Sequence, residues 1–73
     1  MPEIQSAEQL KDSGNSAFSL GNLQQALDDY TNALQLQPED VKLKAIIYRN
    51  RAMVRLRIED YEGAESDCTK GDF

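Results

Sequence analysis

The sequence predicts an all-α fold in which antiparallel helix pairs repeat about twice, as a short fragment of an α-solenoid. An internal similarity supports the repeat, because the segment that begins at Gly14 aligns with the segment that begins at Ala52, an offset of 38 residues. Small residues fall on small ones, as Ala26 does on Ala64. Four segments with apolar or small residues at three- and four-residue spacing support the helices, since this spacing defines one helix face.

The first helix is predicted from about Ser6 to Leu20. Ser6 is a good N-cap, and Gln9 stands three residues later, which is the arrangement of a capping box. The segment "LGN" at 20–22 ends the helix, because Gly21 tolerates the left-handed conformation found at helix C-termini.

The second helix is predicted from about Leu23 to Leu36, and Pro38 follows where a helix cannot continue. Its amphipathic stripe consists of Leu23, Ala26, Leu27, Tyr30, Ala33 and Leu34. The third helix is expected to begin at an Asp40 cap and to run to about Ile58. After the turn "IED", a fourth helix is expected to begin near Tyr61.

The aromatic residues lie at positions that the repeat makes internal. We therefore expect core positions for Phe18, Tyr30, Tyr48 and Tyr61. Cys68 replaces an aromatic residue at the position equivalent to Tyr30, so we expect a buried and inert thiol. The one cysteine excludes an internal disulfide.

Composition limits the classes of function. The chain of 73 residues is large enough for one small domain, and its net charge of −5 repels nucleic acid and anionic membranes at long range. The first ten residues, "MPEIQSAEQL", contain no apolar segment of the secretory type, and no run is long enough to span a membrane. We expect a cytoplasmic protein that does not contact membranes.

The basic residues are concentrated in one predicted helix. Between Val41 and Arg57 there are six basic residues and no acidic one. Arg51 and Arg55 share a helix face, so we expect them to pair with acidic residues of the neighbouring helix, such as Glu59 or Asp60 at its end. Nucleic-acid binding through the arginine block at 49–57 is a remote alternative, because no binding module accompanies the arginines.

The pattern of small, aromatic and proline residues resembles a tetratricopeptide repeat. The residues that carry this resemblance in the first copy are Gly14, Ala26, Tyr30, Ala33 and Pro38. The second copy keeps Tyr48, Ala52 and Ala64 but has Gly71 where the family has alanine. The resemblance implies helical hairpins with the following division of the chain: an N-terminal tail at 1–6, a first repeat at 7–40, an inter-repeat insertion at 41–44 and a truncated second repeat at 45–73.

The segments "LKDSGNSAF" and "YRNRA" resemble the subclass of this family that binds the C-terminal EEVD peptide of cytosolic heat-shock chaperones. The resemblance implies that Lys11, Asn15 and Asn50 grip the terminal carboxylates of that peptide. The run "YRNRAM…DYEGAESDCTK" and the extra residues around "VKLK" are most like the repeat domain of the myosin-directed co-chaperones that carry a UCS domain. Myosin is therefore a possible client.

Spacing alone gives weaker support to these three residues. Lys11 and Asn15 are four residues apart and so share a helix face, but an ordinary solvated lysine beside a polar residue has the same spacing. Asn50 is a weak helix former within a predicted helix, which is consistent either with a ligand contact or with a tolerated surface amide.

The expected function is therefore that of a co-chaperone adaptor. The main alternative is a structural fragment that self-associates, because fewer than two complete repeats leave apolar faces open. We expect such open faces at Ile47, Val54, Leu56, Ala64 and Cys68.

An enzyme is not expected. The sequence has no histidine, no phosphate-cradling glycine loop and no metal-ligand spacing, and no cofactor is implied. Asp28 and Asp29 are adjacent, so on a helix they point about 100° apart and cannot act as a carboxylate pair.

Overall fold

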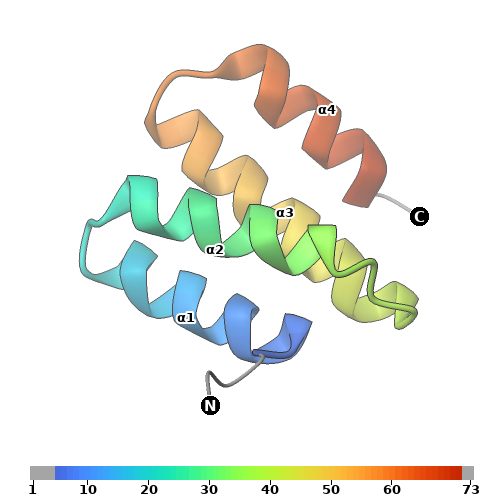
Figure 1. Cartoon of the computed structure of the whole chain (residues 1–73). Helices are drawn as coiled ribbons and strands as arrows, with labels where there is room; N and C mark the ends of the chain where they lie inside the picture. The colour runs from blue at the N-terminus through green and yellow to red at the C-terminus, as the bar shows by residue number, and fades with distance from the viewer. Residues whose placement is uncertain (1–4, 72–73) are drawn as a thin grey trace.

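The computed structural model describes residues 5–71 and consists of four α-helices. They are α1 (Ala7–Ser19), α2 (Leu23–Gln35), α3 (Val41–Arg57) and α4 (Tyr61–Gly71). Helices α1 and α2 form one antiparallel hairpin and α3 and α4 form a second, with α2 packed against α3 (Figure 1). The predicted all-α fold of helical hairpins is confirmed. Parts of the predicted N-terminal tail and of the second repeat, residues 1–4 and 72–73, lie outside the described residues.

The helix ends follow local sequence signals. Ser6 Oγ accepts a hydrogen bond from the Gln9 amide at 3.1 Å, and Gln9 Oε1 accepts one from the Ser6 amide at 2.8 Å, which confirms the capping box. Asp40 caps α3 by accepting from the amides of Lys42 and Leu43 at 3.0 and 3.2 Å. The predicted bounds of the first three helices and the predicted start of the fourth agree with the structure to within one or two residues.

The two hairpin turns have the same backbone geometry. Gly21 follows α1 with φ 80°, and Glu59, 38 residues later, follows α3 with φ 64°. In each turn the next amide donates back into the helix, from Asn22 to the Ala17 carbonyl at 2.8 Å and from Asp60 to the Arg55 carbonyl at 2.7 Å. The second turn thus forces a non-glycine residue into the left-handed region.

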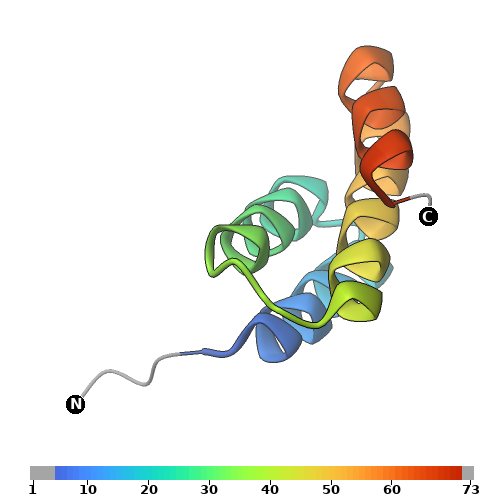
Figure 2. The same ribbon diagram turned by 90° about the vertical axis from the view of Figure 1, so that its right-hand side faces the viewer.

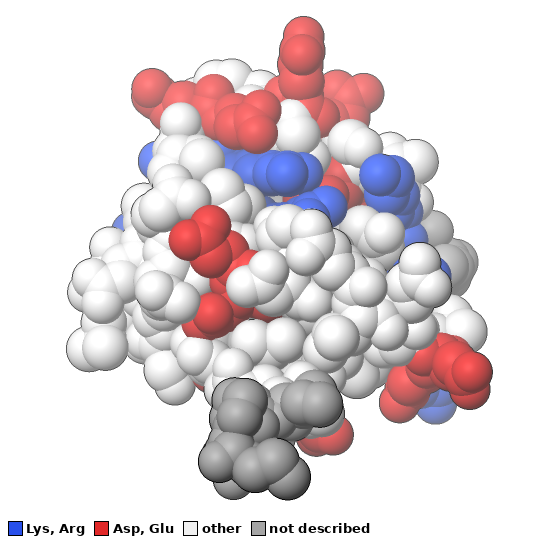
Figure 3. All heavy atoms as spheres, viewed as in Figure 1, with Lys and Arg blue, Asp and Glu red and all other residues white. Residues whose placement is uncertain are grey.

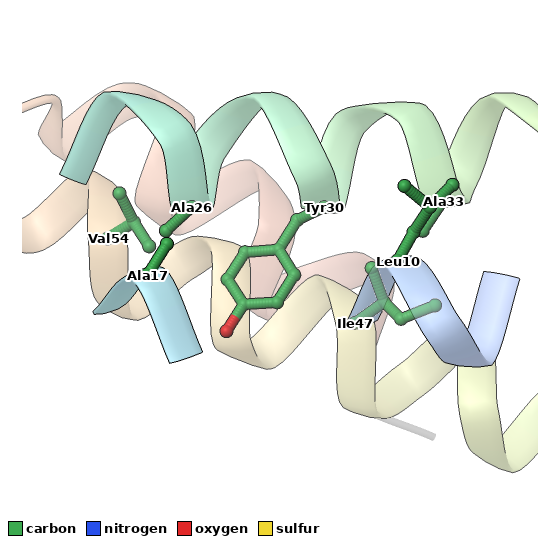
Figure 4. Packing of buried hydrophobic residues seen from close by; sticks show 7 residues of the cluster. All are labelled: Leu10, Ala17, Ala26, Tyr30, Ala33, Ile47 and Val54. Atoms are coloured by element: carbon green, nitrogen blue, oxygen red, sulfur yellow. The ribbon is translucent and has the colours of Figure 1, made fainter. Parts of the chain in front are cut away.

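The core lies where α2 packs against both α1 and α3 (Figure 4). Its buried residues are Leu10, Ala17, Ala26, Tyr30, Ala33, Ile47 and Val54. Gly14 lets the Tyr30 ring lie against α1, because a Cβ on Gly14 would fall 2.6 Å from Tyr30 Cε1. In Figure 2, in which α3 and α4 run up the page, α4 lies along α3, and among the described helices it contacts neither α1 nor α2.

Several burial predictions for the second hairpin were wrong. Tyr61 is 62% exposed and Cys68 is exposed, although both were expected in the core. The reason is that Tyr30, the equivalent of Cys68, lies between α1 and α3, whereas no described helix lies on the outer side of α4.

The prediction that five apolar or small residues of the second hairpin would be open to water was wrong for three of them. Ile47, Val54 and Ala64 are at most 2% exposed, because α3, which carries the first two, packs against α2 and α4, and α4, which carries Ala64, packs against α3. Of the five residues expected to be open, Leu56 and Cys68 are exposed.

Candidate functional site

Asn15 and Asn50, which are distant in sequence, are joined by a hydrogen bond between α1 and α3. Asn50 Nδ2 donates to Asn15 Oδ1 at 3.0 Å. Asn15 is exposed and Asn50 is half-buried, so the pair reaches the surface. Two of the three residues predicted for peptide binding are therefore brought into contact.

Tyr30 of α2 contacts the same oxygen from the core side. Its hydroxyl donates to Asn15 Oδ1 in a short hydrogen bond, while the residue as a whole is only 2% exposed. Asn15 Oδ1 thus accepts two hydrogen bonds, which matches its two lone pairs. Among the side-chain hydrogen bonds of residues 5–71, none uses Asn15 Nδ2.

Burial also affects the acidity of Tyr30. Removal from water is the largest effect and raises the pKa of the phenol above its ordinary value of 10.0, because burial disfavours the phenolate. A hydrogen bond with Asn50 lowers the pKa, and the negative charge of Asp29 raises it. The net shift is upward, so Tyr30 remains a neutral hydrogen-bond donor at neutral pH.

Lys11 lies one helical turn before Asn15 on α1. Its side chain is only 17% exposed, and Nζ lies 3.5 Å from Oδ1 of Asp12, whose own side chain is 66% exposed. The structure does not link Lys11 to either asparagine by a hydrogen bond. Its helical position nevertheless places it on the same face of α1 as Asn15.

Helices α1 and α3 also meet one turn beyond Asn15 on α1 and two turns beyond Asn50 on α3. The Arg57 guanidinium carbon of α3 lies 5.6 Å from the centre of the Phe18 ring of α1. Phe18 follows Asn15 by three residues, and Arg57 follows Asn50 by seven. We call the residues Lys11, Asn15, Phe18, Asn50 and Arg57 the α1/α3 face.

Two of the remaining arginines are internal. Arg51 Nε and Nη2 donate to the two carboxylate oxygens of Asp67 at 2.9 and 2.8 Å, and Arg51 Nη1 donates to Thr31 Oγ1 at 3.3 Å. Arg55 Nη1 donates to Asp67 at 2.9 Å. Figure 3 shows basic side chains flanked by acidic ones beside α3 and α4. These arginines therefore serve the fold.

The predicted arginine partners were right in part. Arg55 Nε lies 3.6 Å from Asp60 Oδ2, as expected, but the main partner of both arginines is Asp67, which sequence reasoning missed. Asp67 is 0% exposed and lies three residues after the buried Ala64. The sequence does contain a signal for this site. Asp67 lies among the small residues of α4, and α3 carries two arginines at spacing i and i+4.

Among residues 5–71, no helix is both long and apolar enough to cross a membrane.

Comparisons with known proteins agree with the repeat pattern. Residues 7–40 match the family model of the tetratricopeptide repeat. The sequence is 46% identical over 71 residues, 96% of the chain, to Protein unc-45 homolog B of Danio rerio. It is 41% identical over 59 residues, 81% of the chain, to DnaJ homolog subfamily C member 7 of Mus musculus.

A third relative is Tetratricopeptide repeat protein 12 of Homo sapiens, 40% identical over 62 residues, or 85% of the chain. The chain spans 8%, 12% and 8% of the lengths of these three relatives. No solved structure matches the chain.

The helical hairpins, the family match and the relatives support one assignment. The first hairpin lies within the residues that match the repeat model, and the second has the same turn geometry 38 residues later. The match to a repeat family also supports the expectation that the chain is not an enzyme. The chain is a tetratricopeptide-repeat domain of about two repeats, a protein-binding module related to regions of unc-45 homolog B and DnaJ homolog subfamily C member 7.

Proposed function

We propose that this domain is a co-chaperone adaptor that docks the acidic C-terminal EEVD peptide of cytosolic heat-shock chaperones. In this proposal Lys11, Asn15 and Asn50 hold the carboxylates of the peptide. The observation that supports it best is the contact between Asn15 and Asn50, which joins two helices at the surface. Within residues 5–71, Asn15 Nδ2 donates to no other side chain, so it is available to a ligand. The resemblance to myosin-directed co-chaperones makes myosin the proposed client. We also propose that residues 41–44 are an insertion between the two repeats.

The chemistry of the α1/α3 face fits an anion. Lys11 supplies an ammonium group, and the two asparagines supply amide hydrogens, which are donors that a carboxylate accepts. Arg57 adds a second positive charge over Phe18. Arg51 and Arg55 are paired within the fold, both with Asp67 and Arg55 also with Asp60, so these two arginines do not need a ligand.

Binding by the 73-residue chain is expected to be weak. The resemblance also implies a lysine and an arginine from a third repeat, whereas residues 5–71 form two helical hairpins. A hydrogen bond to a charged group typically contributes about 1.5–3 kcal/mol, so two fewer bonds lower affinity by about a hundredfold or more.

Titration of the isotope-labelled protein with an EEVD peptide, followed by NMR, tests the proposal. We expect shift changes centred on Lys11, Asn15 and Asn50 with the free-acid peptide, and much smaller changes with its C-terminally amidated form. Equal changes with both peptides, or none with either, would contradict the site.

A pair of charge variants separates the site from long-range attraction. Lys11→Met and Lys42→Met remove the same charge, but Lys42 is exposed in the first turn of α3. Only Lys11→Met is expected to weaken binding of the free-acid peptide strongly. Equal weakening by both variants would show that net charge, rather than a defined site, controls binding.

Self-association is the second candidate function, and exposed apolar residues favour it. Tyr61, Met53 and Leu56 are 62%, 52% and 45% exposed, and Cys68 is exposed on the outer helix. A second copy of the chain is the partner proposed to cover these exposed residues. Light scattering that shows a stable monomer at high micromolar concentration would remove this candidate.

A further inference from the structure

We infer that Tyr30, a buried tyrosine of α2, sets the orientation of the Asn15 amide and so makes the peptide site selective for carboxylates. The inference rests on the proposed peptide site and adds to it a residue that does not touch the ligand. Tyr30 is thus a positioning residue, and its hydroxyl is the group that acts.

The position of the hydroxyl is set by the core. Tyr30 is 2% exposed, and its ring lies so close to Gly14 that a Cβ at that position would be 2.6 Å from Cε1 and 2.8 Å from Cδ1. Close packing on a rigid aromatic ring leaves the hydroxyl little freedom to follow a ligand. The hydroxyl therefore occupies a defined position before any peptide binds.

This hydroxyl favours one of the two orientations of the Asn15 amide. With Oδ1 turned toward the core, Asn15 accepts from both the Tyr30 hydroxyl and Asn50 Nδ2. With the amide reversed, Nδ2 of Asn15 would face Nδ2 of Asn50, and the Tyr30 proton would lose its acceptor. An unpaired buried donor is unfavourable, so the first orientation is preferred.

The preferred orientation determines what the surface offers a ligand. Since Oδ1 is occupied by the Tyr30 hydroxyl and by Asn50 Nδ2, Asn15 presents the two hydrogens of its own Nδ2 to a ligand. Such a site accepts a carboxylate, which has only acceptor oxygens, and disfavours an amidated terminus, which brings N–H groups of its own. The preference for a free C-terminus would thus originate in the core.

The variant Tyr30→Phe tests this inference, because it keeps the ring and removes the hydroxyl. We expect about tenfold weaker binding of the free-acid EEVD peptide and a smaller ratio of free-acid to amide affinity, with the helical circular dichroism spectrum retained. Tyr48→Phe is the matched control. Tyr48 is half-buried on α3, and its ring lies beneath Arg51 and Lys70. Removal of its hydroxyl is therefore expected to leave the ratio of free-acid to amide affinity unchanged.

A measurement on the unmodified protein tests the orientation without any variant. We expect the Asn15 side-chain amide protons to exchange freely with water before peptide is added, and to shift when the free-acid peptide binds. Asn15 amide protons that are protected in the free protein would show the reverse orientation and overturn the inference.

The outcomes also separate this inference from the proposed function. If wild-type protein distinguishes the two peptides and folded Tyr30→Phe distinguishes them equally well, the positioning role is wrong and the peptide site stands. If wild-type protein does not distinguish them, the proposed peptide site itself fails.

Discussion

Arg51 and Asp67 form a two-point ion pair that joins α3 to α4, with nitrogen–oxygen distances of 2.9 and 2.8 Å and no exposed surface on Asp67. The first hairpin has an equivalent contact 38 residues earlier, where Ser13 donates to Asp29 at 2.7 Å and Gln25 donates to it at 2.9 Å. Asp29 is also buried, at 5% exposure. Both hairpins thus close around a buried aspartate, one through neutral donors and the other through arginines.

This difference predicts unequal costs for two matched substitutions. Asp67→Asn leaves the buried Arg51 without an anion and Arg55 with only its longer contact to the exposed Asp60, so we expect a loss of about 3–5 kcal/mol in the free energy of unfolding. Asp29→Asn leaves neutral donors that an amide oxygen still accepts, so we expect about 1 kcal/mol. Urea unfolding followed by circular dichroism measures both, since the chain has no tryptophan. Equal losses would mean that Asp67 does not act through its charge.

The close approach of Gly14 to Tyr30 predicts that Gly14→Ala is destabilising although alanine favours helices. The added methyl group would overlap a rigid ring at 2.6 Å, and overpacking of this kind costs about 1–3 kcal/mol. The higher helix propensity of alanine offsets up to about 1 kcal/mol of this cost, so we expect a net loss of about 1 kcal/mol in the free energy of unfolding. Ser16→Ala, on an exposed position of the same helix, is the control and should be neutral or slightly stabilising. A more stable Gly14→Ala protein would show that the ring moves aside.

The left-handed backbone of Glu59 predicts a stabilising substitution. At φ 64° an L-residue is strained by about 1–2 kcal/mol, and glycine is not. Part of that gain is offset because glycine makes the unfolded chain more flexible, so Glu59→Gly is expected to raise the free energy of unfolding by about 0.5–1 kcal/mol. Glu59→Ala removes the same charge and keeps the strain, so it should change little. If both variants stabilise the protein equally, charge is the cause instead.

The raised pKa of Tyr30 predicts loss of stability at alkaline pH. The folded state holds the phenolic proton more tightly than the unfolded state, so its contribution to stability is complete below about pH 10 and declines as the pH rises through the folded pKa. We expect the unfolding midpoint of wild type to fall more steeply above pH 10 than that of Tyr30→Phe, in which the other titrating groups are the same. Parallel curves would contradict a raised pKa.

The exposure of Cys68 predicts a reactive rather than a protected thiol. A disulfide reagent such as Ellman's reagent should modify the folded protein at a rate within a few-fold of that of the urea-unfolded chain. If the folded thiol reacts about a hundredfold more slowly at every protein concentration, Cys68 is covered within the chain, contrary to the structure. Protection that appears only as concentration rises would indicate that a second copy covers α4.

The helix limits were predictable from the sequence because their causes are local. The Ser6 and Gln9 capping box, the Asp40 cap and the left-handed Gly21 each depend on hydrogen bonds or dihedral angles within a few residues. The contact between Asn15 and Asn50 spans 35 residues, and it was only a family resemblance that assigned both residues to one peptide site. Spacing within one helix carries no information about which face of another helix it will meet.

The sequence by itself thus determined four helices and the caps at Ser6 and Asp40, since periodicity and capping act within a turn or two of the chain. The 38-residue repeat added the arrangement in two hairpins. Only the tertiary structure decided that Asp67 is buried between two arginines, that the Tyr30 hydroxyl reaches Asn15, and that Tyr61 and Cys68 remain exposed. Burial depends on whether another element covers a face. Tyr30 lies between α1 and α3 and is covered, whereas Cys68, at the equivalent position of α4, has no described helix beyond it.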